Sequence, residues 1–221
     1  MTDTIENQPI LKQLNEVTHV PIIQRQKRLI VQKGESDFDT ERFFYFILSG
    51  KIKISQINFE TSKEQILYLL GSGDMFDVAA LLDGKGSEYL IEVIEDGEVV
   101  EVPIGDVREL LSKEPAFQRF FFPYVAKQIR NLEELAIDLS LYDVYQRIIR
   151  LFAKYVDNHA RHPQLGIIEN LSHEELASMV GSVRKVVNRA LQKLKKDGII
   201  DVSRKQIKLL DLQKLLQKIE Y

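Results

Sequence analysis

The sequence contains no cysteine and no run of apolar residues long enough to cross a membrane. Without cysteine there are no disulfides, thiolate zinc sites, cysteine-ligated iron–sulfur clusters, cysteine nucleophiles or thiol redox sensors. Residues 1–17 carry early acids and lack a basic region followed by an apolar run, so they do not resemble a secretory signal. A membrane span needs about 18 apolar residues or more, and no segment offers that. We therefore expect a cytoplasmic protein with no membrane partner.

Histidine is scarce as well, because only His19, His159, His162 and His173 occur. His159 and His162 lie close together, but Pro163 follows them and no third ligand stands nearby, so the spacing is not typical of a metal site. An enzyme built on a cupin-like barrel would need a cluster of histidines and a carboxylate on its strands. We predict no metal, no cofactor and no enzymatic activity.

The charge is unevenly distributed along the 221 residues. The formal net charge is −3, yet residues 183–221 contain eleven lysines or arginines against four acids, a local charge of +7 that leaves −10 for the remainder. A basic end on an acidic body indicates a local contact with a polyanion. The length and the 44% hydrophobic content are sufficient for two packed domains.

The first hundred or so residues have the pattern of short strands separated by glycines. FFYFILSGKIKISQI (43–57) predicts a hairpin that turns at Gly50, and residues 64–76 predict another strand ending in a glycine turn. Residues 89–103 predict two strands around a turn at Gly97. This spacing is typical of an antiparallel sandwich or barrel, which could be a ligand cage or a scaffold.

Helical spacing begins after Pro103. Residues 104–111 predict a short helix, and Pro123 is suited to the first turn of a longer one. An apolar stripe along this second helix is compatible either with a two-helix dimer seam or with packing on the protein's own sheet. The stripe, which we assign to dimerisation, consists of Val125, Ile129, Leu132, Leu135, Ala136 and Leu139.

Residues 141–160 predict a further amphipathic helix, and Ile167 with Ile168 indicates a short strand after it. Ser172 then opens an S-x-x-E capping box with Glu175, which is typical of a helix start. The helix is short, and Gly181-Ser182 makes a sharp turn after it.

A second helix follows that turn, with one apolar and one basic face. Asp197-Gly198 ends it, and DVSRKQIKLLD then predicts a two-stranded wing with a basic tip. Such a helix pair suits the major groove, which admits one helix whose amino-terminal residues meet the base edges. A basic helix face alone is more often a solvated surface, but here the cap, turn, stripe and wing occur in order. The predicted buried stripe is Val183, Val186, Val187, Ala190, Leu191 and Leu194.

The segment LSHEELASMVGSVRKVVNRALQKLKKDGII (171–200) resembles the helix-turn-helix of the CRP/FNR superfamily of bacterial transcription regulators. FFYFILSGKIKI, LGSGDMF and LYDVYQRI, in that order, extend the resemblance over nearly the whole chain. It implies an α+β fold with an antiparallel, cyclic-nucleotide-binding-like β-roll over residues 1–122. A dimerisation helix and hinge would occupy 123–142, and a winged helix-turn-helix 143–221.

By position, the resemblance implies that Arg184, Lys185 and Arg189 read bases and that Ser172 and His173 touch phosphate. Many members have an acid in place of Lys185, so we expect an unusual half-site, because a lysine cannot accept a hydrogen bond from cytosine. The complete predicted DNA-binding set is Ser172, His173, Ser182, Arg184, Lys185, Asn188, Arg189, Lys193, Arg204 and Lys205.

The sensor part departs from the cyclic-AMP-binding members it resembles. Those members have Gly-Glu after the LGSGD phrase and then an Arg-Ser pair that grips the cyclic phosphate, whereas this chain has Asp77-Val78 and Glu88-Tyr89. No arginine occurs between Ile52 and Ile104, and an acid would repel a phosphate. Leu132-Glu133 also stands where hydroxyls would contact adenine.

We therefore predict a homodimeric, sequence-specific DNA-binding regulator of an inverted repeat, with RNA polymerase as a partner that the family implies. It would not be gated by cyclic AMP through the usual site. A regulator gated by an unidentified small molecule in the β-roll is the alternative. A cyclic-nucleotide module acting on a protein partner would leave the basic end without a role.

Overall fold

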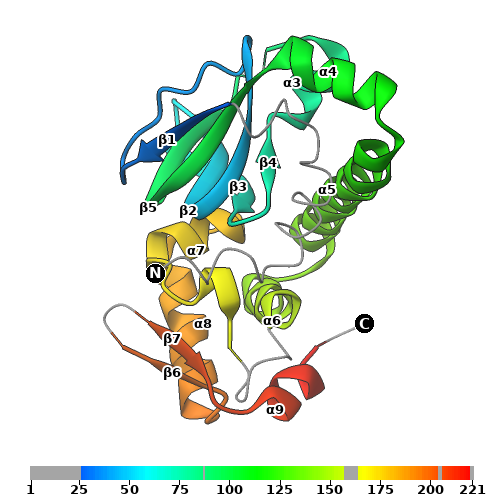
Figure 1. Ribbon diagram of the computed structural model, residues 1–221. Helices are drawn as coiled ribbons and strands as arrows, with labels where there is room; N and C mark the ends of the chain where they lie inside the picture. The colour runs from blue at the N-terminus through cyan, green and yellow to red at the C-terminus, as the bar shows by residue number, and fades with distance from the viewer. Residues whose placement is uncertain (1–25, 87, 157–163, 204–205, 220–221) are drawn as a thin grey trace, which may run out of the picture. The chain divides into compact units, whose positions relative to one another are not determined.

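The computed structural model describes residues 26–86, 88–156, 164–203 and 206–219 (Figure 1). The chain divides into two compact units. One comprises the residues up to Ser55 together with Tyr68–Asn131, and the other comprises Gln56–Leu67 and the chain from Leu132 onward. The predicted domain boundaries stay a prediction.

An antiparallel sheet, as the sequence predicts, lies mainly in the first unit; only the end of β2 and the start of β3 fall within Gln56–Leu67. Its strands are hydrogen-bonded in the order β1-β5-β2-β3, with β4 pairing with β2. The aromatic start of β2 pairs with the end of β5, for example Phe44 opposite Val102. The strands are β1 (Lys27–Val31), β2 (Phe43–Asn58), β3 (Lys63–Leu70), β4 (Met75–Phe76) and β5 (Leu90–Pro103).

The turns predicted at Gly50 and Gly97 are wrong, because β2 and β5 each run straight through these glycines. The two glycines instead face each other where the β2–β5 register shifts. A Cβ on Gly97 would lie 2.1 Å from the carbonyl oxygen of Ser49, and a Cβ on Gly50 would lie 2.7 Å from that of Glu95. The glycines therefore permit a close backbone approach at a bulge, which is the other common use of glycine in a strand.

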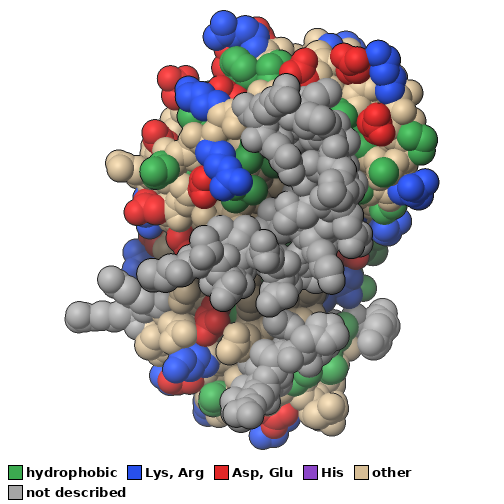
Figure 2. Space-filling model, in the orientation of Figure 1, with side chains coloured by type: hydrophobic (Ala, Val, Ile, Leu, Met, Phe, Trp, Pro, Cys, Tyr) green, Lys and Arg blue, Asp and Glu red, His purple; other side chains and the backbone are tan. Residues whose placement is uncertain are grey.

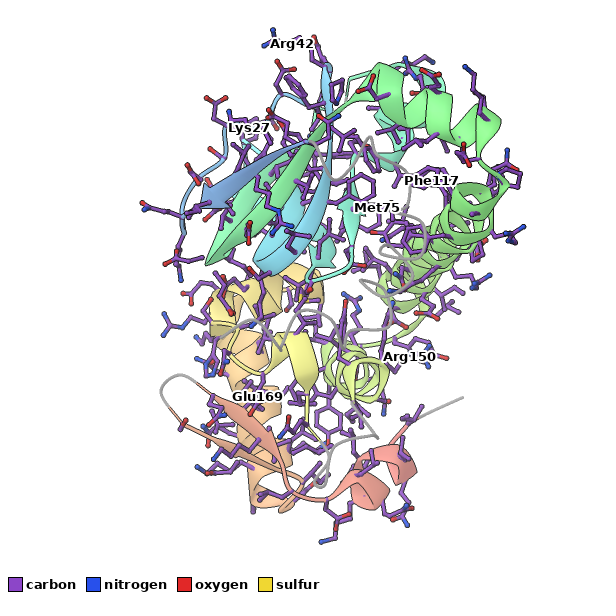
Figure 3. The ribbon with its side chains drawn as sticks, viewed as in Figure 1. Lys27, Arg42, Met75, Phe117, Arg150 and Glu169 are labelled. Carbon is purple, nitrogen blue, oxygen red and sulfur yellow. The ribbon has the colours of Figure 1, made fainter. Side chains whose placement is uncertain are left out.

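The alternation along β2 divides the core of this unit into two clusters. Phe44 and Phe46 pack with Met75 of β4 and with Phe117, which belongs to the long helix that begins at Pro115. Met75 and Phe117 are labelled in Figure 3. Tyr45 packs in the opposite cluster, where its ring stacks on Phe76 with centroids 5.0 Å apart. Burial and the nearby Glu101 raise the pKa of Tyr45. Side chains therefore fill both sides of the first half of β2.

Three helices belong wholly or partly to this unit: α3 (Val78–Asp83), α4 (Ile104–Lys113) and α5 (Pro115–Leu141). The prediction that Pro123 begins the long helix is wrong. Pro115 occupies the first position, where its missing N–H costs nothing, and Pro123 lies exposed inside the helix. In the described part of the surface that Figure 2 shows, acidic and basic side chains are interspersed.

The second unit is mainly helical after the end of α5. The predicted strand at Ile167 and Ile168 is wrong, since these residues form a single 3₁₀ turn. The predicted helix over 141–160 begins later, because the Asp143 side chain accepts a hydrogen bond from the Gln146 amide and caps it. The elements are α6 (Val144–Tyr155), η1 (Gly166–Ile168), α7 (His173–Met179), α8 (Arg184–Lys196), β6 (Ile200–Val202), β7 (Ile207–Leu209) and α9 (Leu212–Gln217). The α+β fold is confirmed.

Candidate nucleic-acid interface

Helix α7 begins at the predicted capping box. The Ser172 Oγ accepts a hydrogen bond from the Glu175 amide at 3.1 Å, and the Glu175 carboxylate accepts one from the Ser172 amide at 2.6 Å. Two backbone donors at the helix start are thus satisfied locally. Leu176 and Ala177 are buried on the opposite side of the helix, so the short helix has a defined inner face.

The turn between α7 and α8 needs glycine. Gly181 has φ +63°, and a Cβ there would lie 2.4 Å from Cδ2 of Leu139. Arg147 of α6 fixes the same region by donating hydrogen bonds to the carbonyl oxygens of Val180, Leu139 and Tyr142 at 3.0, 2.9 and 2.8 Å. One guanidinium therefore connects the end of α7 to the end of α5.

The α5–α6 junction carries further charged contacts. Arg150, labelled in Figure 3, pairs with Asp138 at 2.6 Å, and its guanidinium lies 4.3 Å from the Tyr142 ring centroid. Its hydrogen bond to Asp138 raises the pKa of Arg150. One helical turn later, Lys154 pairs with Glu134 at 2.7 Å. These contacts align α6, which supports the helix-turn-helix, with the last turns of α5.

Helix α8 buries only part of the predicted stripe. Val187, Ala190, Leu191 and Leu194 are buried, as predicted. The prediction that Val183 and Val186 are buried is wrong, since both are exposed. They come from the first turn of α8 and its cap, whereas the buried residues are all later in the helix. Periodicity identifies an apolar face but does not reveal how far along a helix its packing partners extend.

Helix α8 exposes most of its basic side chains. The helix contains six lysines or arginines and no acid. Arg184, Lys185 and Arg189 are exposed, whereas Lys193 places its ammonium 4.0 Å from the ring centroid of Tyr145. The first half of the helix can thus present guanidinium and ammonium donors to a partner.

Arg184 has an acidic neighbour across the turn. Its Nη1 lies 2.8 Å from an oxygen of Glu174, and both side chains are largely exposed. An exposed ion pair is weak, so the guanidinium can exchange this partner for another acceptor.

The remaining predicted residues are arranged around the same face. Ser172 is exposed at the α7 start, while His173 and Ser182 are half-buried. Asn188 is also half-buried, and its Oδ1 is buried without a hydrogen-bond partner among the described residues. Reading adenine with this amide would require its side chain to rotate.

The predicted wing is present as an antiparallel pair, β6 and β7, with Asp201 opposite Lys208. Ser203 donates its amide to the Gln206 carbonyl at 3.0 Å next to the tip. Arg204 and Lys205, predicted to make phosphate contacts, lie outside the described residues.

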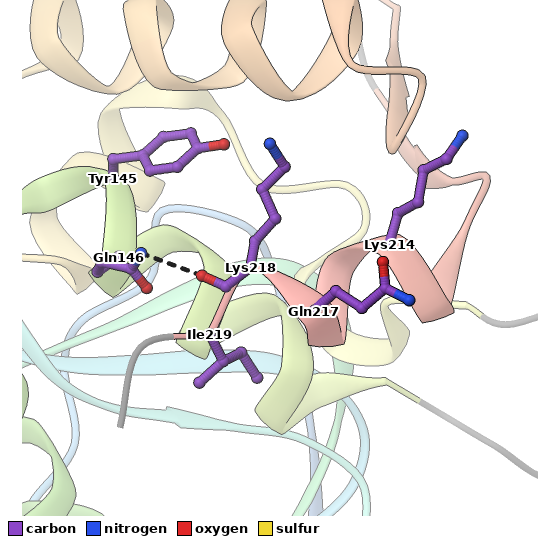
Figure 4. Close-up of a pocket in the computed structure, with 6 residues that line it drawn as sticks. All are labelled: Tyr145, Gln146, Lys214, Gln217, Lys218 and Ile219. Carbon is purple, nitrogen blue, oxygen red and sulfur yellow. Dashed lines mark hydrogen bonds between the residues drawn. The ribbon is translucent and has the colours of Figure 1, made fainter.

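Helix α9 was not predicted, although Asp211 before the apolar run LQKLL is a capping signal. The helix lies beside α6 (Figure 4), where the Gln146 amide donates to the Lys218 carbonyl at 3.0 Å. The Lys218 ammonium pairs with Asp197 at 2.7 Å, and this hydrogen bond lowers the pKa of Asp197 and raises that of Lys218. The pocket in Figure 4 thus lies between the start of α6 and α9. The Lys218–Asp197 ion pair also connects this region to the end of α8.

The predicted dimer stripe of α5 is largely exposed. Ile129, Leu132 and Ala136 are exposed, while Val125 and Leu139 are half-buried. Leu135 is half-buried on a flank of this line. Sequence reasoning missed Phe122, which is exposed three residues before Val125 and continues the alternating steps of three and four.

Two features of the described residues bear on other kinds of function. No group of three or more metal-ligating side chains was found among them. None of their helices combines the length and the apolar character of a membrane span.

Family models match both units of the chain. The model for the Crp-like helix-turn-helix domain matches residues 146–218, which include α7, the turn, α8 and the wing. The model for the cyclic nucleotide-binding domain matches residues 25–114, which include the sheet. The chain belongs to the CRP/FNR superfamily. Members of the CRP/FNR superfamily are DNA-binding transcription regulators and not enzymes.

Curated relatives agree with this membership. The chain is 27% identical over 187 residues to the cAMP-activated global transcriptional regulator CRP of Haemophilus influenzae, covering 82% of this chain and 80% of the relative. It is also 27% identical to the global nitrogen regulator of a Synechocystis strain, with 74% of each chain covered.

Two solved structures share the fold of this chain at low sequence identity. A CooA mutant from Carboxydothermus hydrogenoformans superposes with a TM-score of 0.77 at 22% identity, covering 96% of this chain and 95% of that one. FixK2 from Bradyrhizobium japonicum gives 0.75 at 18% identity, with 89% and 98% covered.

Proposed function

We propose that the protein is a homodimeric transcription regulator that binds an inverted repeat in duplex DNA through α7, α8 and the wing. The observation that carries this proposal is the first half of α8, which exposes Arg184, Lys185 and Arg189 while burying its opposite face. Guanidinium groups at this position can donate two hydrogen bonds to guanine in the major groove. Because its target is the bacterial chromosome, we place the protein in the cytoplasm.

The exposed line on α5 supports the homodimer. Phe122, Val125, Ile129, Leu132, Ala136 and Leu139 alternate at steps of three and four residues, which is the spacing of a coiled-coil seam. Exposed leucine and isoleucine in such a line are better covered by a second copy of the helix than by water. A twofold dimer would then offer two recognition helices about 34 Å apart to successive major-groove faces. RNA polymerase is the partner that family membership suggests.

We further propose that cyclic AMP does not gate the protein through the family's usual site. Glu88 and Tyr89, at the positions of the phosphate-gripping pair, are both exposed, and Glu88 would repel the cyclic phosphate. The pKa of Tyr68 is raised to about 12, mainly by burial and to a smaller extent by the nearby Tyr89 and Asp77. An aromatic and acidic surrounding of this kind does not suit a phosphodiester anion. A different small molecule in the roll is the second candidate for regulation.

The proposal is tested by selecting bound sequences from a random duplex library with the purified full chain, without added ligand, at near-physiological salt. We expect an inverted repeat whose half-sites lie about one helical turn apart. Calorimetric titration of the same preparation with cyclic AMP should show no saturable heat. Failure to enrich any sequence, both with and without cell extract, would contradict DNA recognition. Saturable cyclic AMP binding would contradict only the gating part.

A further inference from the structure

Two valines at the beginning of α8 are exposed without a local reason. Val183, the cap residue, exposes 50% of its surface, and Val186, in the first turn, exposes 36%. The other apolar residues of α8 are all buried. Valine is not favoured inside a helix, because its branched side chain loses rotamer freedom against the preceding turn, and it is not favoured at an N-cap, because it has no side-chain acceptor. Neither packing nor helix propensity therefore accounts for these two side chains.

The surroundings of the valines indicate what covers them. Val186 precedes Arg189 by three residues and Lys193 by seven, so the three share one flank of α8. Val183 lies three residues before Val186, next to Arg184 in the chain. An apolar pair framed by cations, on a helix without acids, matches a surface that carries apolar groups between anions.

The major groove of DNA is such a surface. Phosphates line its edges, and the 5-methyl group of each thymine projects into it from the base pairs. A methyl group contacting an isopropyl side chain removes apolar area from water on both partners. Cytosine lacks that methyl group and cannot offer the same contact.

We propose that Val183 and Val186 contact thymine 5-methyl groups, so that each operator half-site carries thymine at the positions these side chains face. This inference rests on the proposed DNA-binding function. It assigns the base selectivity of α8 to two apolar residues in addition to its arginines. Removing one methyl group should weaken binding about fourfold for each half-site, the factor for about 0.8 kcal/mol per buried carbon.

The test uses the operator recovered by selection and replaces its thymines one at a time with deoxyuridine, symmetrically in both half-sites. This substitution removes the methyl group and retains every hydrogen-bonding group. Dissociation constants are measured at fixed salt for the full-length wild type, Val183→Ala and Val186→Ala. For wild type, we expect a loss at specific thymines. Val186→Ala and Val183→Ala should each become insensitive, within about 1.5-fold, to one of those replacements.

A matched control is Leu216→Ala, which shortens an exposed apolar side chain on α9. It should retain the wild-type response at every thymine, and circular dichroism would verify that all variants are folded. If no deoxyuridine replacement weakens wild type, or if the valine variants respond as wild type does, the valine contacts are wrong and the operator still supports the proposed function. If selection with and without cell extract yields no operator, both proposals fail.

Discussion

Arg184 stands at the first position of α8, and its guanidinium is exposed apart from its ion pair with Glu174. We expect Arg184→Ala to cost about 1–3 kcal/mol of operator binding and to relax selectivity at one base pair, as loss of a bidentate guanine contact would. Arg204→Ala, in the predicted wing tip, should instead weaken all sequences evenly. Dissociation constants on a panel of single-base operator variants measure both. Identical profiles for the two variants would contradict this division of roles.

In the proposed complex, Glu174 would compete with DNA phosphates and bases for Arg184, since the two side chains form an ion pair. We expect Glu174→Gln to strengthen operator binding roughly twofold to fivefold, because an exposed ion pair contributes about 0.2–1 kcal/mol and the carboxylate also repels phosphate. The gain in affinity should shrink as the salt concentration is raised from about 50 to about 200 mM, because salt screens exposed charges. The matched control is Glu133→Gln, an exposed acid on α5. Weaker binding by Glu174→Gln would show that Glu174 itself contacts the operator.

The start of α7 depends on two reciprocal hydrogen bonds. Ser172→Ala removes the acceptor for the Glu175 amide, so we expect the C-terminal unit to lose roughly 0.5–2 kcal/mol of stability. Glu175→Gln keeps an oxygen that can accept from the Ser172 amide and should change stability much less. Hydrogen exchange of the α7 amides reports the local free energy of opening. Equal protection in Ser172→Ala and wild type would show that the cap contributes nothing.

The close approach of β2 and β5 at Gly97 can be tested by substitution. Gly97→Ala places a Cβ 2.1 Å from the Ser49 carbonyl oxygen, so both strands would have to separate, and we expect a loss of more than about 3 kcal/mol. Gly105 lies in α4 with nothing within 4 Å of its Cβ position. Gly105→Ala should therefore stabilise the protein by about 0.4–1 kcal/mol. Urea unfolding of the first unit compares the two variants. Similar unfolding midpoints for Gly97→Ala and Gly105→Ala would contradict the close approach.

The proposed homodimer can be tested on the whole molecule. A carboxylate in an apolar seam would be desolvated on both copies, so Leu132→Glu should convert the protein to monomers in sedimentation experiments. The matched control is Ile137→Glu, which changes an exposed residue outside the seam and should leave the dimer intact. The monomer should lose most operator affinity, because each half-site would be bound alone. A Leu132→Glu protein that stays dimeric would rule out this seam.

The features that the sequence predicts correctly in the second unit are those that depend on local contacts. The Ser172 cap, the Gly181 turn and the apolar face of α8 were predicted because caps and helices depend on contacts within about four residues. The same locality explains why Asp211 could have revealed α9. The wing was predicted for a similar reason, since its strands are joined by a short loop.

Composition and short-range periodicity were enough to predict strands before Pro103, helices after it, and the basic character of α8. The resemblance to a known family added the α+β class and the winged helix-turn-helix. Tertiary structure decided that Gly50 and Gly97 are contacts and not turns, since they meet across strands 47 residues apart. It also decided that Val183 and Val186 are exposed. A hydrophobic pattern states which side chains could be buried, and burial itself depends on what the rest of the chain places opposite them.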